Sequence, residues 1–219
     1  SCDNQLKWYH NVPILSYVFL RGKCGFCGAK ISARYPFVEI LNAACYLYFF
    51  WQYGWSLPFG VFAFLSSVLI VIFFIDFDFQ IIPDLITLPG MVLGLAVSFA
   101  PGGIGILASA IGLLVGGGAL YLVAILGDWL FKKESMGGGD IKMAAMLGAF
   151  LGWQKVLLVF LGSAVIGLVV SVILMSFSAK LRANRVIPFG PFISMAAMVA
   201  IVWGDTIISY YVENFLHIQ

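Results

Sequence analysis

Long apolar runs, separated by short polar stretches, occupy most of the chain beyond residue 35. Windows of about 20 residues, the length of a helix that crosses a bilayer, predict about seven spans. They lie near residues 36–56, 58–76, 85–100, 104–130, 141–153, 156–177 and 187–204. The run that ends at Asp76 is apolar on all sides, as a lipid-embedded helix requires. We therefore predict an all-α, polytopic membrane helical bundle.

Composition and charge support this class. Hydrophobic residues make up 62% of the chain and charged residues 10%, whereas soluble domains carry roughly 25% charged residues. Lys and Arg gather before the first span, around Asp140 and in the loop 178–186. The positive-inside rule therefore predicts that these segments and both Asp motifs face the cytoplasm. Because topology accounts for the basic residues, the net charge of +2 favours no nucleic-acid partner.

Two regions follow from this pattern. Residues 1–35 are polar and are predicted to form a small cytoplasmic, cysteine-containing segment, and residues 36–219 a transmembrane domain. The chain starts abruptly with SCDNQ inside the polar segment. We therefore expect that residues are missing upstream.

The polar segment contains a candidate metal site. Cys24 and Cys27 form a C-x-x-C pair flanked by glycines, and Cys2 supplies a third thiol. Such a turn lets two thiolates reach one tetrahedral ion, which predicts a structural, zinc-knuckle-like site. The fourth ligand would be His10 or a cysteine before residue 1. A redox pair or a disulfide is the alternative, which a cytoplasmic location disfavours.

Asp76 and Asp140 each end or begin an apolar run. A carboxylate in such a segment is costly and usually faces a protein cavity, so two of them suggest a shared site. Paired carboxyl groups can act as general acid and base, as in aspartic peptidases. Glycines before Asp140 and prolines after Asp76 interrupt the helices, and broken helices also mark ion sites in transporters. From the residues alone, a peptidase and a transporter both remain possible.

Several motifs together resemble the bacterial prepilin peptidases of the bifunctional type. They are WYHNVPILSYVFLRGKCGFCGAKISARYPFVEILNA, IDFDFQIIPDLITLP, MGGGDIKMAAMLGAFLGW and IPFGPF. This resemblance implies that the first Asp of D-x6-P and the Asp of G-x-G-D, here Asp76 and Asp140, form the catalytic dyad. It makes Asp78 and Asp84 secondary, and it implies one further span upstream of residue 1.

The resemblance also implies a two-step activity at the bacterial inner membrane. The enzyme would cleave the leader of type IV prepilins and pseudopilins, the substrates of type IV pilus and type II secretion systems, after a glycine on the cytoplasmic side. It would then methylate the new N-terminal residue, with S-adenosylmethionine as the methyl donor.

Glu39 is the candidate residue for the methyl-transfer step. It lies in an apolar stretch, where a carboxylate requires a cationic partner such as the amine or the sulfonium. A salt bridge to Arg34 is the structural alternative. Two other functional classes remain possible: a transporter that uses Asp76 and Asp140 as ion ligands, and a non-catalytic scaffold built on the cysteine cluster.

Overall fold

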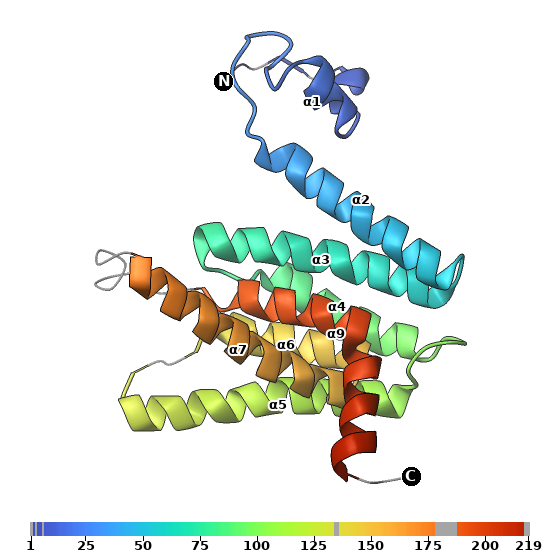
Figure 1. The fold of residues 1–219 in the computed structure, drawn as a ribbon, viewed down its shortest axis with the longest axis vertical. Helices are drawn as coiled ribbons and strands as arrows, with labels where there is room; N and C mark the ends of the chain where they lie inside the picture. Colours follow the sequence, from blue (N-terminus) through green and yellow to red (C-terminus); the bar gives the residue numbers. More distant parts are fainter. Residues whose placement is uncertain (1, 3, 6, 134–135, 178–187, 217–219) are drawn as a thin grey trace. The chain divides into compact units, whose positions relative to one another are not determined.

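A computed structural model describes residues 2, 4–5, 7–133, 136–177 and 188–216. Its helices are η1 (Trp8–Asn11), α1 (Leu15–Phe19), α2 (Arg34–Tyr53), α3 (Leu57–Phe79), α4 (Asp84–Ser98), α5 (Ile106–Phe131), α6 (Gly138–Leu151), α7 (Trp153–Phe177), α9 (Gly190–Tyr211) and η2 (Val212–Leu216) (Figure 1). Within these ranges the only β pairing is an isolated bridge between Lys23 and Lys30. The predicted all-α class is confirmed.

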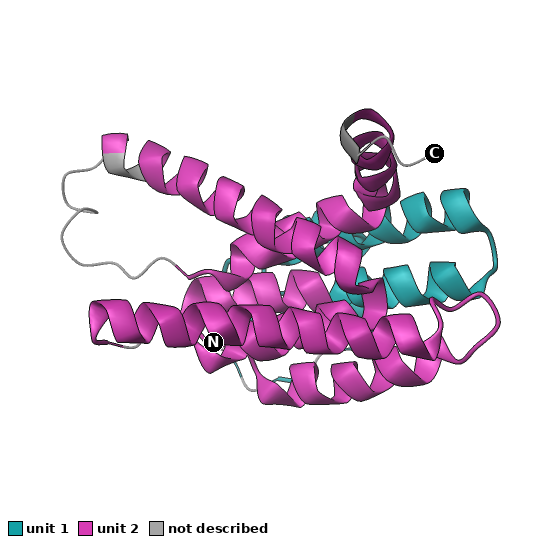
Figure 2. Ribbon diagram, turned by 90° about the horizontal axis from the view of Figure 1, so that it is seen from below, with its two compact units in different colours: residues 1–67 teal, residues 68–219 magenta. Residues whose placement is uncertain are grey.

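The chain forms two compact units, residues 1–67 and 68–219 (Figure 2). The first contains η1, α1, the cysteine loop, α2 and the beginning of α3. Within it, Phe49 of α2 packs against Phe62 of α3, with ring centroids 5.7 Å apart. Ser67 donates a hydrogen bond of 2.8 Å to Asn42 Oδ1. Apolar and polar contacts therefore both join α2 to the first half of α3.

In the second unit, α6 is the central helix. It packs against α4, α5, α7 and α9, and every residue from Met143 to Leu151 is buried. Small residues make these contacts close: the backbones of Gly112 on α5 and Gly148 on α6 touch, and Gly116 lies against the Ala144 backbone. In membranes, where lipid is as apolar as the side chains, such close backbone packing is a principal source of helix association.

Each predicted span falls on one helix of the structure. Among the residues that the structure describes, four helices are long and apolar enough to cross a membrane: Leu57–Phe79, Ile106–Phe131, Trp153–Ile173 and Gly190–Asn214. The chain is thus a multi-pass membrane protein, while the number of about seven crossings stays a prediction. The short fifth span corresponds to α6, whose 14 residues extend about 21 Å at 1.5 Å per residue. The basic loop 178–186 lies outside the described residues.

Candidate active site and cysteine cluster

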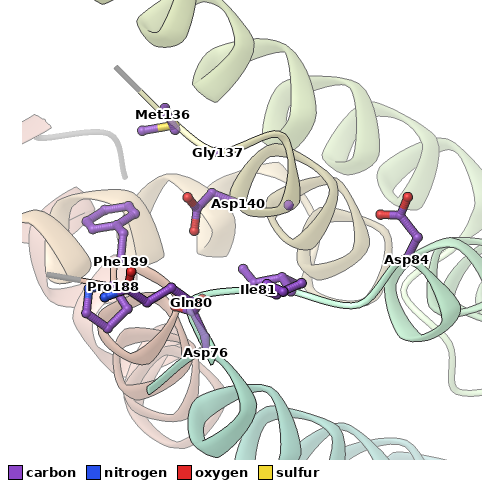
Figure 3. Close-up of a pocket in the computed structure, with 11 residues that line it drawn as sticks. Asp76, Gln80, Ile81, Asp84, Met136, Gly137, Asp140, Pro188 and Phe189 are labelled. Atoms are coloured by element: carbon purple, nitrogen blue, oxygen red, sulfur yellow. The ribbon is translucent and has the colours of Figure 1, made fainter. Parts of the chain in front are cut away.

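Asp76 and Asp140 line one cavity of about 530 Å³ in the second unit. Its other walls come from the 80–84 segment, the residues at the start of α6 and the two residues before α9. Figure 3 shows Asp140 extending from α6 toward Phe189, with Gln80 and Pro188 beside them. The fold thereby brings together two carboxyl groups that are 64 positions apart in the sequence.

Asp76 is held in a fixed position near the end of α3. Its side chain is buried, with 5% of the residue exposed, and its Oδ2 accepts a hydrogen bond of 3.0 Å from the backbone N–H of Gly190. A methyl group at Gly190 would lie 2.6 Å from the same oxygen. Only glycine therefore lets the first turn of α9 approach the Asp76 carboxyl group closely enough to donate this bond.

Asp140 lies in the first turn of α6, directly after the glycine run. Its backbone N–H bonds the Gly137 carbonyl at 3.1 Å, and the position at a helix N-terminus favours a negative charge. A methyl group at Gly139 would lie 2.9 Å from Ile82 Cβ. Gly139 therefore has a packing role: it lets α6 begin against the segment that follows Asp76.

Lys142 and Asp84 form an ion pair at the edge of this site. Lys142 Nζ lies 2.6 Å from Asp84 Oδ2 and 2.8 Å from Oδ1. In Figure 3, Asp84 lies on α4, on the opposite side of the view from Phe189. Lys142 thereby joins the N-terminal parts of α4 and α6, which both border the cavity.

Sequence reasoning missed the specific role of Gly190. Pro188 and Phe189, which belong to the IPFGPF motif, line the cavity. Nothing in the motif, however, shows that the Gly190 N–H would reach Asp76, because that contact joins residues 114 positions apart. Gln80, which also lines the cavity and has a positive φ of 56°, carried no sequence signal.

Cys2, Cys24 and Cys27 cluster in the first unit. Their sulfur atoms all lie within 4.8 Å of one another, and the Sγ atoms of Cys2 and Cys24 are 3.8 Å apart. Sulfurs bound to one tetrahedral zinc at about 2.3 Å are about 3.8 Å apart. The three cysteines thus fit zinc. Among the described residues His10 is not part of this group, so one of the two candidates for a fourth ligand is not brought to the cluster.

The turn that carries Cys24 favours a thiolate. Backbone N–H groups of Cys27 and Phe26 point at its sulfur and lower the pKa of Cys24 to about 7. Contact with the Cys27 and Cys24 side chains raises the pKa of Cys2. A thiolate at one cysteine therefore makes deprotonation of a neighbouring cysteine less favourable. A divalent cation bound to both sulfurs would remove this repulsion.

Zinc binding can be tested by metal analysis. We expect the purified chain to retain zinc and Cys24→Ser to lose it, because this change removes the ligand whose thiolate forms most readily. Cys45→Ser, a change of a cysteine outside the cluster, is the matched control and should leave the metal content unchanged. A metal-free wild-type preparation with full activity would show that the cysteine cluster is not a required metal site.

Glu39 lies on α2 and is not part of the cysteine group. Its Oε2 accepts a hydrogen bond of 2.6 Å from the backbone N–H of Ile14. It lines a second cavity, of about 320 Å³, that lies wholly within the first unit and is also bordered by Cys24. Glu39 thus connects α2 to the segment that precedes α1, and it places a carboxylate in a cavity.

Comparisons with known proteins show which family the chain resembles. The pattern of the type IV leader peptidase family matches residues 63–172, and that of the bacterial peptidase A24 N-terminal domain matches residues 1–53. A prepilin leader peptidase/N-methyltransferase of Stutzerimonas stutzeri is 39% identical over 97% of this chain and 73% of its own length. Proteins with the same name from Pseudomonas aeruginosa and Legionella pneumophila are 37% and 36% identical, over 97% and 98% of this chain and 73% and 75% of their own lengths. No solved structure matches the chain.

Proposed function

The chain belongs to the type IV leader peptidase family, and we propose that it cleaves the leader of type IV prepilins and pseudopilins with Asp76 and Asp140 and then methylates the new N-terminus. The family and the names of the relatives confirm the prediction of an enzyme with peptidase and methyltransferase activity. The main observation in support of the proposed dyad is that both carboxyl groups line the same cavity, together with residues of the 80–84 and 136–140 segments.

Two carboxyl groups in one cavity can act as the general base and the general acid of peptide hydrolysis. Like charges held close together cannot both ionise easily, so the pair keeps one proton. The ionised member takes a proton from water, and the protonated member donates to the carbonyl oxygen or the leaving amine. The Gly190 N–H keeps the Asp76 carboxyl group in one orientation, so the geometry is set before substrate binds.

Orientation and domain organisation are part of the same proposal. The Lys and Arg pattern supports an orientation in which both Asp residues lie at the cytoplasmic face, and we propose the bacterial inner membrane as the location. There, the apolar helix of a prepilin can reach the cavity from the bilayer while its basic leader stays in the cytoplasm. We also propose residues 1–35 as the cytoplasmic segment and 36–219 as the peptidase domain.

S-adenosylmethionine and zinc are the proposed cofactors. When bound, S-adenosylmethionine supplies an activated methyl group on a positively charged sulfur. The Glu39 carboxylate, fixed by the Ile14 N–H in a cavity of about 320 Å³, fits a cationic ligand of this kind. Cys2, Cys24 and Cys27 would hold zinc. Its role would be structural, because the peptidase carboxyl groups lie in the other unit.

One incubation tests both activities. Detergent-solubilised protein is mixed with a prepilin and S-adenosylmethionine, and the pilin product is analysed by mass. We expect a product that lacks the leader and is heavier by one methyl group than the mature chain. Intact prepilin at the end of the reaction would contradict the proposal. Uptake of an ion by vesicles containing the protein, lost in Asp76→Asn, would then favour the transporter hypothesis.

A further inference from the structure

Helix α1 presents apolar side chains to the outside of the first unit. Leu15, Val18 and Phe19 follow the i, i+3, i+4 spacing that puts side chains on one face of a helix. Their exposed fractions are 56%, 64% and 81%. Tyr17, in contrast, lines the cavity of this unit, and its hydroxyl group donates a hydrogen bond to the Ile31 carbonyl. The apolar face of α1 therefore points away from the unit, the reverse of a helix on the surface of a soluble domain.

A neighbouring element adds to this exposed face. The short helix η1 packs against α1 and carries Trp8, which is 82% exposed. Single exposed apolar residues are ordinary, but several on adjoining elements mark a site of interaction with a protein or a membrane. Tryptophan is also enriched where proteins meet the membrane–water interface. We call Trp8, Leu15, Val18 and Phe19 the apolar patch.

Basic side chains flank the apolar patch in the sequence. Lys7 directly precedes η1, and Arg21 and Lys23 follow α1; all three are exposed. Lys23 and Lys30 are opposite each other in an isolated antiparallel bridge, an arrangement in which like charges destabilise the pairing. Within the described residues, neither lysine forms an ion pair with a carboxylate. A negatively charged group beside the bridge would offset this repulsion.

Contacts within the first unit tie α1 to a membrane-crossing helix. The Ile14 N–H, directly before α1, donates a hydrogen bond of 2.6 Å to Glu39 Oε2 on α2. Helix α2 in turn packs antiparallel to the first part of α3, one of the helices long and apolar enough to cross a membrane. The 20 residues of α2 extend about 30 Å, which matches the hydrocarbon thickness of a bilayer. We therefore expect its first turns, and α1 with them, at a membrane surface.

We propose that η1, α1 and the 21–30 loop dock on an anionic lipid surface, the headgroup layer of the leaflet at which α2 begins. The apolar patch enters the boundary between headgroups and acyl chains, and the four basic residues Lys7, Arg21, Lys23 and Lys30 contact lipid phosphates, as in other interfacial segments. A lipid leaflet offers both complements, acyl chains and phosphate groups, beside a chain that already crosses the membrane. The inference concerns how the first unit is held and does not depend on the reaction catalysed.

Photo-cross-linking in nanodiscs tests this docking. The intact chain, with benzoylphenylalanine in place of Phe19, is placed in discs of phosphatidylglycerol or of phosphatidylcholine, and the adducts are identified by mass. We expect lipid adducts, mainly with phosphatidylglycerol. Lys23→Gln combined with Lys30→Gln should lower their yield about tenfold, since each basic side chain near an anionic leaflet strengthens binding. Lys132→Gln, a change of an exposed lysine in the second unit, is the matched control and should leave the yield unchanged.

Hydroxyl-radical labelling of the unmodified chain in the same discs adds a measurement that needs no substitution. We expect Trp8 and Phe19 to be labelled less in phosphatidylglycerol than in phosphatidylcholine. Strong and equal labelling of both residues in the two lipids would overturn the proposal. Adducts from position 19 to this chain or to a second copy instead of lipid, or lipid adducts that do not depend on lipid charge, would overturn it as well. Leader cleavage could persist in each of these cases, so the proposed function is tested separately.

Discussion

Replacement of Asp76 or Asp140 by asparagine is expected to abolish leader cleavage while leaving the chain folded. An amide can neither take a proton from water nor carry the proton that the pair shares, and loss of a general acid or base costs about 10² to 10⁴ in rate. The two changes should not be additive, because the carboxyl groups act as one unit. The measurement is the rate of mature pilin formation from a prepilin.

Asp78→Asn is the matched control for this prediction. Asp78 is two positions from Asp76 and exposed, and it does not line the cavity, so this variant should keep most of its activity. Substantial cleavage by Asp76→Asn or Asp140→Asn would exclude the dyad. Complete loss of cleavage in Asp78→Asn would indicate that Asp78, and not Asp76, is the catalytic aspartate of IDFDF.

Gly190→Ala is expected to reduce cleavage about 10²-fold, although no ionisable group changes. The new methyl group would lie 2.6 Å from Asp76 Oδ2, so the carboxyl group or the first turn of α9 must move. Either movement disturbs the hydrogen bond from the Gly190 N–H. A displacement of about 1 Å at a catalytic group can cost about 10² in rate. Single-turnover cleavage of a prepilin measures the effect.

Gly118→Ala provides the comparison for Gly190→Ala. Gly118 lies within α5, and a methyl group there would meet nothing within 4 Å. Alanine is favoured over glycine inside a helix, so this variant should be as active as wild type and no less stable. If Gly190→Ala cleaved at the wild-type rate, the bond from its N–H to Asp76 would have no part in positioning the dyad.

Much of the fold was predictable because its signals are local. A helix in lipid satisfies its own backbone hydrogen bonds, so an apolar run of sufficient length predicts a helix with little reference to the rest of the chain. The run before Asp76 and the run after Gly105 are both such cases, and they form α3 and α5. For α6, the pattern predicted a short span but not that it would lie buried among four other helices.

The candidate site was predictable in its residue types and not in its contacts. Carboxylates at the ends of apolar runs are costly enough to indicate a functional role, so Asp76 and Asp140 are candidates from the sequence alone. The pairing of Lys142 with Asp84, 58 positions away, has no local signal. The same holds for the His10 ring, which could have joined the cysteines but instead packs between Tyr9 and Phe26.

The sequence by itself determined the helical membrane class, the two aspartates, the cysteine cluster and the family resemblance, because composition, apolar run length and short motifs act over neighbouring residues. Tertiary structure alone decided that the Gly190 N–H holds Asp76, that the Gly139 turn packs on Ile82, and that Glu39 and His10 share a cavity. Each of these depends on the close approach of backbone segments distant in sequence. The distance between such segments depends on packing across the whole unit, so no local sequence pattern predicts it.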